Sequence, residues 1–159
     1  MRPTAYKDTS VPAVQSQQDV KRLLVKYGCS AVSTAEDLTQ GTITLRFARL
    51  MENTEQPVIV RLTARLPDLP SIRTTYRSPS PERVERERRE KAERQAWRAL
   101  YYAVKSRMES IVFGIESFEE AFLSHVEVIG KEGEKLTLGE WALPRMASGR
   151  LQITTGREG

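Results

Sequence analysis

The spacing of apolar side chains predicts a short helix near the start of the chain. Val20, Leu23, Leu24 and Tyr27 follow one another at i, i+3, i+4 and i+7, which is one face of an amphipathic helix. Ser16 can cap this helix, with Asp19 in its first turn, and Gly28 stands where a helix usually stops. Lys21, Arg22 and Lys26 lie off the apolar stripe, where they could touch phosphates, although a solvated face is the commoner role of such residues.

Between residues 31 and 66 the apolar period changes to two, which is typical of strands. Ile43, Leu45 and Phe47 alternate with Thr42, Thr44 and Arg46, and Val58, Val60, Leu62 and Ala64 alternate with Ile59, Arg61, Thr63 and Arg65. The polar segment 51–57 joins these two strands as a hairpin, and a weaker strand from Ser30 to Ala35 precedes them. We therefore expect a three-stranded antiparallel meander.

A long helix is predicted from Pro81 to Val112, a stretch that no glycine or later proline interrupts. Its first half is charged, and four Glu–basic pairs stand at i, i+4: Glu82–Arg86, Glu85–Arg89, Glu87–Lys91 and Glu90–Arg94. Its second half carries apolar residues at core spacing: Trp97, Leu100, Tyr101, Val104, Met108 and Ile111. We expect the first half to project from the molecule and the second half to pack.

The C-terminal third is predicted to be small and mixed. Ser117 to Glu120 and Thr137 to Glu140 both have the capping-box pattern of a helix start, and Pro144 should limit the second helix to a turn or kinked stub. Val126–Ile129 and Lys135–Leu138 can form a hairpin between them. The whole chain is then one α+β domain: an arm (1–15), helix and meander (16–66), a Pro/Ser linker (67–80), the long helix (81–112), a C-terminal subdomain (113–148) and a tail (149–159).

Composition fits this expectation, since 39% of the 159 residues are apolar and 29% are charged. No apolar run approaches the roughly 20 residues that a membrane helix needs, so we expect no membrane contact. The first ten residues lack the apolar stretch of a secretory signal, and the single cysteine, Cys29, cannot form an internal disulfide. A reducing cytoplasm is the expected location. The net charge of +4 permits an acidic partner.

Candidate binding residues lie on three predicted elements. The polar face of the sheet carries Arg46, Arg61 and Arg65 among threonines, which suits phosphate oxygens but is also the make-up of an ordinary solvent-facing sheet. The linker adds an aromatic residue between cations, and the long helix adds two further arginines: Arg73, Tyr76 and Arg77, and Arg94 and Arg98. A linker of this composition can clamp a nucleic-acid strand by stacking and charge.

Most enzyme chemistries lack their residues in this chain. Zinc needs three or four ligands, whereas the chain has one cysteine and one histidine, His125. Neither a dinucleotide-binding fingerprint nor a phosphate-binding loop is present, so no cofactor is expected. One carboxylate cluster has the residue types of a Mg²⁺ site: Glu116, Glu119 and Glu120. Helix-capping and surface roles explain these residues more simply. We predict that the protein is not an enzyme.

Four segments resemble a family of small, uncharacterised proteins of bacteriophages and prophages: Tyr6–Pro12, the helix from Ser16-Gln17 to Lys26-Tyr27-Gly28, Trp97–Leu100 and Gly114–Glu120. The resemblance implies a viral context, in a bacterial host cell, but supplies no activity and no site residues. Separately, the order helix, meander, long helix is similar in topology to phage single-strand annealing proteins. Unrelated folds have the same order of elements. The similarity therefore favours nucleic-acid binding as a hypothesis but identifies no site residues.

Two hypotheses follow. In the first, the protein is a nucleic-acid-binding accessory factor of phage recombination or replication that holds the phosphate backbone of DNA, including single-stranded DNA; assembly into a homo-oligomer would favour strand annealing. In the second, it is an interaction module that binds and modulates a host enzyme or another host or phage protein through the charged helix Glu82–Arg94. A metal-dependent nuclease is a distant third.

Overall fold

The computed structural model describes residues 3–51, 54–68 and 80–152, and has the α+β architecture that the sequence predicts. Its elements are α1 (Ala13–Lys26), β1 (Ala31–Asp37), β2 (Thr42–Arg49), β3 (Val58–Arg65), α2 (Pro81–Val112), α3 (Phe118–Phe122), the short 3₁₀ helix η1 (Leu123–His125), β4 (Glu127–Ile129), β5 (Lys135–Thr137) and α4 (Leu138–Ala147). None of the helices in the described ranges is long and apolar enough to cross a membrane.

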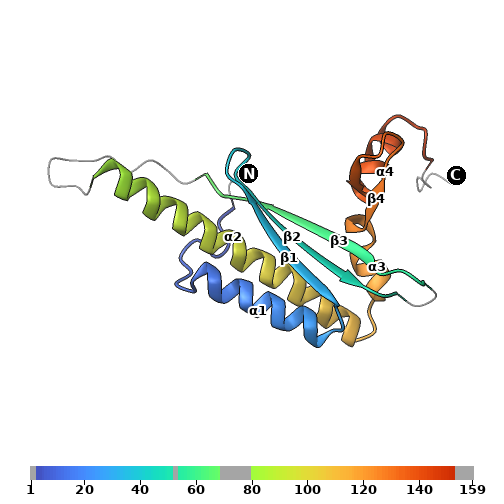
Figure 1. The fold of residues 1–159 in the computed structure, drawn as a ribbon, viewed down its shortest axis with the longest axis horizontal. Coiled ribbons are helices and arrows are strands. Elements are labelled where there is room, and N and C mark those ends of the chain that lie inside the picture. Colours follow the sequence, from blue (N-terminus) through green and yellow to red (C-terminus); the bar gives the residue numbers. More distant parts are fainter. Residues whose placement is uncertain (1–2, 52–53, 69–79, 153–159) are drawn as a thin grey trace, which may run out of the picture.

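One helical layer covers one face of the antiparallel sheet β1-β2-β3. α1 and the later part of α2 lie side by side on that face, as Figure 1 shows. The alternation in β2 and β3 directs Ile43, Leu45, Phe47, Val60 and Leu62 into the core, where they join Val20, Leu24, Trp97, Leu100, Val104 and Met108. Each such apolar side chain contributes about 1.5–3 kcal/mol when fully buried. The opposite face of the sheet, here called the outer face, has no helical layer in Figure 1.

The expected start of α1 at Ser16 is wrong, because the helix begins at Ala13 with Pro12 as its N-cap residue and without a side-chain cap. The buried residues of α1 are Ser16, Val20 and Leu24, spaced by four. Ser16 therefore belongs to the packed face of the helix, where its hydroxyl is enclosed and unable to cap. Gly28, at φ 82°, follows the end of the helix as predicted.

α2 divides as the sequence predicts. Its buried residues all lie between Ala92 and Met108, and none lies between Pro81 and Lys91. Ser80 caps the helix by accepting from the amide of Arg83. The four predicted Glu–basic pairs are wrong in detail: Arg83 pairs with Glu87, Arg89 with Glu93 (both 2.9 Å), and Arg88 with Glu85 (3.4 Å). Every charge on this surface has neighbours on two sides, and exposed pairs differ little in energy, so spacing does not select the partner.

The N-terminal segment is tied to α2. The side-chain amide of Gln95 donates to the carbonyls of Pro3 (3.1 Å) and Ala5 (2.7 Å). Tyr6, at φ 58°, stacks on Tyr102 with ring centroids 5.0 Å apart. The segment before α1 thus lies against the outer surface of the long helix.

The C-terminal segment wraps around the edge of β3. Phe118 and Phe122 of α3 pack edge-on against Phe47 on the inner face, at centroid distances of 6.5 and 5.4 Å. The chain then passes the free edge of β3, where Val126 bridges Val60, and forms the predicted β4-β5 hairpin. Both predicted capping boxes are present.

The expectation that Pro144 would reduce α4 to a turn or stub is wrong, because the helix continues to Ala147. A proline inside a helix removes one backbone donor but leaves the others in place. The start of α4 is held by the capping box of Thr137 and Glu140. In its second turn the Arg145 guanidinium donates to the carbonyl of Trp141 at 2.5 Å.

Candidate functional site

The structure brings the predicted sheet residues together on the outer face. Arg46 of β2 lies directly opposite Arg61 of β3, and Thr44 lies opposite Thr63 with their hydroxyls 3.2 Å apart. Arg65 ends β3 on the same face. The alternation of the two strands therefore gives the basic and hydroxyl-rich surface that the sequence predicts.

Two of these three arginines already hold carboxylates of the C-terminal segment. Arg46 donates from Nε and Nη2 to the two carboxylate oxygens of Glu127, at 2.8 and 2.6 Å. Arg61 donates to Glu140 and lies 3.8 Å from Glu127. The hydrogen bond to Glu127 raises the pKa of Arg46 further above its already high value. Two positive and two negative charges meet here, so this cluster presents no net charge to a phosphate.

The cluster has a clear structural role. Glu127 opens β4, and its side chain is only 8% exposed, so its charge needs the arginines as partners. Glu140 lies in the first turn of α4, where it also completes the capping box. Arg46 and Arg61 therefore fasten the β4-β5 hairpin and α4 to the outer face of the sheet.

The outer face also lacks a stacking platform. The outward positions of β1, β2 and β3 carry Ala, Ser, Thr, Asp, Arg and one Ile, and no aromatic ring. Sheet surfaces that bind single-stranded nucleic acid stack its bases on aromatic side chains. The linker residues that were expected to supply one, Arg73, Tyr76 and Arg77, lie outside the described residues.

Arg98 of α2 is used within the fold. Its guanidinium lies 3.6 Å from the carboxylate of Asp19 on α1, and over the rings of Tyr101 and Tyr102 at 4.6 and 4.9 Å. The side chain is 17% exposed. Arg98 thus joins the two helices and is a poor candidate for contacting a phosphate.

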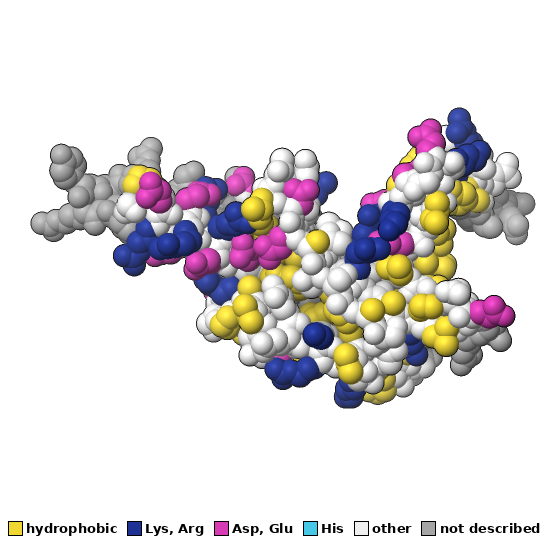
Figure 2. All heavy atoms as spheres, viewed as in Figure 1, with side chains coloured by type: hydrophobic (Ala, Val, Ile, Leu, Met, Phe, Trp, Pro, Cys, Tyr) yellow, Lys and Arg dark blue, Asp and Glu magenta, His cyan; other side chains and the backbone are white. Residues whose placement is uncertain are grey.

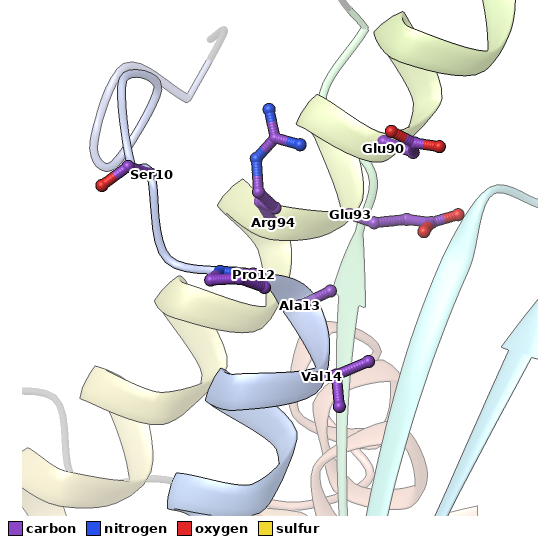
Figure 3. Close-up of a pocket in the computed structure, with 7 residues that line it drawn as sticks. All are labelled: Ser10, Pro12, Ala13, Val14, Glu90, Glu93 and Arg94. Carbon is purple, nitrogen blue, oxygen red and sulfur yellow. The ribbon is translucent and has the colours of Figure 1, made fainter.

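Arg94 is half-buried beside a shallow depression of about 380 Å³. Figure 3 shows the residues that line it: Ser10, Pro12, Ala13, Val14, Glu90, Glu93 and Arg94. The side chains of Glu90 and Glu93 point to a different side of α2 from that of Arg94. Within the described part of the chain, Arg65 and Arg94 are the two predicted binding arginines without an ion-pair partner.

Two titratable side chains away from the arginine–glutamate cluster, Cys29 and His125, have shifted pKa values. Burial raises the pKa of the Cys29 thiol to about 11, against a smaller opposing effect of Arg49, so it stays protonated at neutral pH. Burial, and next the positive charge of Arg107, lower the pKa of His125. Among the described residues, no three His, Cys, Asp or Glu side chains gather as metal ligands would.

Sequence reasoning missed two features of this surface. Glu127 and Glu140 were not expected to meet Arg46 and Arg61, because partners about 80 residues apart leave no mark in local spacing. The second feature is an exposed apolar cluster at the end of α2, Val112, Phe113 and Ile115. A signal for it existed, since Val112 and Phe113 fall off the core stripe that passes through Val104, Met108 and Ile111.

Comparison with protein-family models, with curated proteins and with solved structures finds no match to this chain. The resemblance to phage and prophage proteins therefore stays a prediction, as does nucleic-acid binding.

Proposed function

We propose that this protein is a non-enzymatic interaction module that docks on another protein through the charged arm of α2, defined as Pro81–Arg94. The observation that carries the proposal is that the arm buries no side chain over most of its length, although Arg88 and Lys91 reach Asp68 and Asp8 at 3.3 and 3.9 Å. From Pro81 to Lys91 none of its side chains is buried, a span of about 16 Å at 1.5 Å per residue. Figure 1 shows the start of α2 extending away from the sheet and from α1.

The charge pattern of the arm favours a protein partner over a polyanion. Six basic and five acidic side chains alternate along it, a net charge of +1. A phosphate backbone would meet a carboxylate wherever it approached, whereas a protein surface of matching charge pattern can satisfy both signs. The ion pairs within the arm are exposed and each contributes at most about 1 kcal/mol, so they can be exchanged for intermolecular pairs at low cost.

The later part of α2 adds little free positive charge. Arg98 is held by Asp19, and Lys105 lies 3.6 Å from Glu109. Arg107 donates to the carbonyls of Ala103 and Ala121, at 3.0 and 3.2 Å. The basic side chains of this part of the helix are thus engaged inside the molecule, two by carboxylates and Arg107 by backbone carbonyls. The partner that we propose is a host or phage protein in a bacterial cytoplasm, in line with the resemblance to prophage proteins.

A photo-crosslinking residue placed at Arg86, which is exposed on the arm, tests the proposal in bacterial cells. The matched control carries the same residue at Lys131, which is exposed in the β4-β5 turn. We expect one discrete protein adduct from position 86 and none from position 131. Equal labelling from both positions would contradict docking through the arm.

A second measurement separates the two hypotheses. Fluorescence anisotropy with labelled single-stranded DNA, double-stranded DNA and RNA is recorded over a salt series. We expect weak binding that does not distinguish the three ligands. Tight binding with a steep salt slope, lost on changing Arg65 and Arg94 to Ala, would favour the nucleic-acid hypothesis instead.

A further inference from the structure

An exposed apolar cluster lies at the end of α2. It consists of Val112, Phe113 and Ile115 and is here called the apolar tip. Their exposed fractions are 64%, 80% and 76%. The other three phenylalanines of the chain, Phe47, Phe118 and Phe122, are buried. Clustered apolar side chains of this kind mark a contact site more often than single exposed ones do.

The backbone at the end of α2 explains where the tip points. The amide of Gly114 (φ 68°) donates to the carbonyl of Ile111, and that of Ile115 to the carbonyl of Ser110, at 3.1 and 3.0 Å. This is a Schellman motif, in which the residue at the position of Ile115 usually packs on an apolar side chain three or four residues before the cap. Here those positions are Ser110 and Glu109. The motif therefore fixes Ile115 at the surface without covering it.

α1 offers a surface that complements the tip. Gln18, Lys21, Arg22, Val25 and Lys26 share the face of α1 that points away from the core, and they line a shallow depression of about 490 Å³. Val25 is 59% exposed within it. We call this face the basic strip. The methylene groups of its long side chains supply apolar surface, and their ends supply positive charge.

The charges around the two surfaces are opposite in sign. Glu109, which lies 3.6 Å from Lys105, precedes the tip and Glu116 follows it, whereas Lys21, Arg22 and Lys26 border the basic strip. Both surfaces lie towards the same end of the molecule, because α1 runs beside the later part of α2 in the same direction, and α2 continues past the end of α1 (Figure 1). Figure 2 shows basic and apolar side chains mixed over this lower end.

We propose that two copies of this chain associate about a two-fold axis, with the apolar tip of each copy seated on the basic strip of the other. Because tip and strip lie at one end, a single rotation satisfies both contacts and closes the assembly as a dimer. The acidic borders of the tip disfavour an anionic membrane as the alternative occupant. This inference does not rest on the charged arm, which lies at the far end of α2 and stays free in the dimer.

The small size of the contact places it among weak, transient interfaces. Each phenylalanine can bury 150–250 Å² at most, so two tips and their surroundings give an interface near the lower end of specific contacts, roughly 1,200 Å² or less. Contacts of this small size are typically weak and transient, so we expect a dissociation constant on the order of 10–100 µM. The dimer would then bring two charged arms to one partner and raise its avidity.

Sedimentation velocity over a concentration series tests the proposal with the full chain. We expect a monomer–dimer equilibrium for the wild type, weakened at least about tenfold by Phe113→Glu, Lys26→Glu or Glu116→Lys. The double variant Lys26→Glu/Glu116→Lys should regain part of the lost affinity, because it restores opposite charges across the contact. Phe113 and Lys26 are exposed and Glu116 is half-buried, and thermal unfolding checks that each variant is folded.

Leu38→Glu is the matched control. Leu38 is 65% exposed in the turn between β1 and β2, at the end of β1 opposite to the tip, and its change should leave the equilibrium as in the wild type. A wild-type protein that stays monomeric above about 100 µM would overturn the proposal. So would a dimer that both charge reversals leave unchanged.

Discussion

Replacing Glu127 by Gln tests whether the Arg46–Glu127–Arg61 cluster holds the C-terminal segment on the sheet. The substitution keeps the shape of the side chain but removes its charge. It also replaces one carboxylate oxygen, which accepts a hydrogen bond from Arg46, by an amide NH2 group. In the wild type Glu127 Oε2 accepts from Nη2 of Arg46 at 2.6 Å, and an NH2 group at this place would set donor against donor. Two arginines lose a shared counter-ion in one step.

The expected loss can be estimated from the exposure of the partners. A hydrogen bond to a charged group contributes about 1.5–3 kcal/mol, and breaking a fully buried pair costs about 3–5 kcal/mol. Glu127 is 8% exposed, but the Arg46 side chain is 35% exposed and regains water, so screening reduces the loss. We expect the free energy of unfolding to fall by about 2 kcal/mol, and the melting temperature by about 4–8 °C.

Urea denaturation followed by circular dichroism measures this change. Glu132→Gln is the matched control, because it makes the same chemical change at an exposed position in the β4-β5 turn, where about 0.5 kcal/mol or less is expected. If Glu127→Gln destabilises the protein no more than Glu132→Gln does, the cluster does not hold the segment and the reasoning is refuted. Faster proteolysis after residue 123 in Glu127→Gln would add that the segment detaches locally.

Three further outcomes are expected. Cys29 should react with iodoacetamide at pH 8 much more slowly in the folded than in the urea-unfolded protein, because burial raises its pKa to about 11, and equal rates would contradict that burial. The folded-state pKa of His125 lies below its ordinary value near 6.5, so its contribution to stability is present above that pH and is lost as the pH falls below it; His125→Gln should flatten this part of a stability–pH profile, and an unchanged profile would exclude the histidine as its source. Thr137→Ala should lower the free energy of unfolding by about 1 kcal/mol through loss of the α4 cap, whereas Thr39→Ala, in the exposed β1-β2 turn, should leave it nearly unchanged in the same denaturation experiment.

The spacing of residues along the chain was sufficient to predict those features that depend on interactions between sequence neighbours. The alternation in β2 and β3, the Ser80-Pro81 start of α2 and the two capping boxes depend on residues at most four positions apart, and all were predicted. The division of α2 into a projecting and a packed half also followed, because an apolar stripe must be buried and a fully charged helix surface need not be.

Predictions failed where several local arrangements of the chain or of its side chains have similar energies. Ser16 is a good cap by type, but the packing of α1 on α2 extended the helix one turn further and enclosed the serine instead. The ion pairs along the charged arm were predicted with the wrong partners, because each charge has several exposed neighbours of nearly equal worth.

The sequence by itself determined the elements of this protein and their order, because turn chemistry, caps and apolar periods act over a few residues. Only the tertiary structure decided what the charges do, since Arg46, Arg61 and Arg98 find their counter-ions on segments about 80 residues away in the chain. Coulomb attraction depends on distance in space, and spacing along the chain does not encode that distance. The position of Val112 and Phe113 off the core stripe is written in the sequence, but that no other segment covers them and Ile115 was decided by the fold.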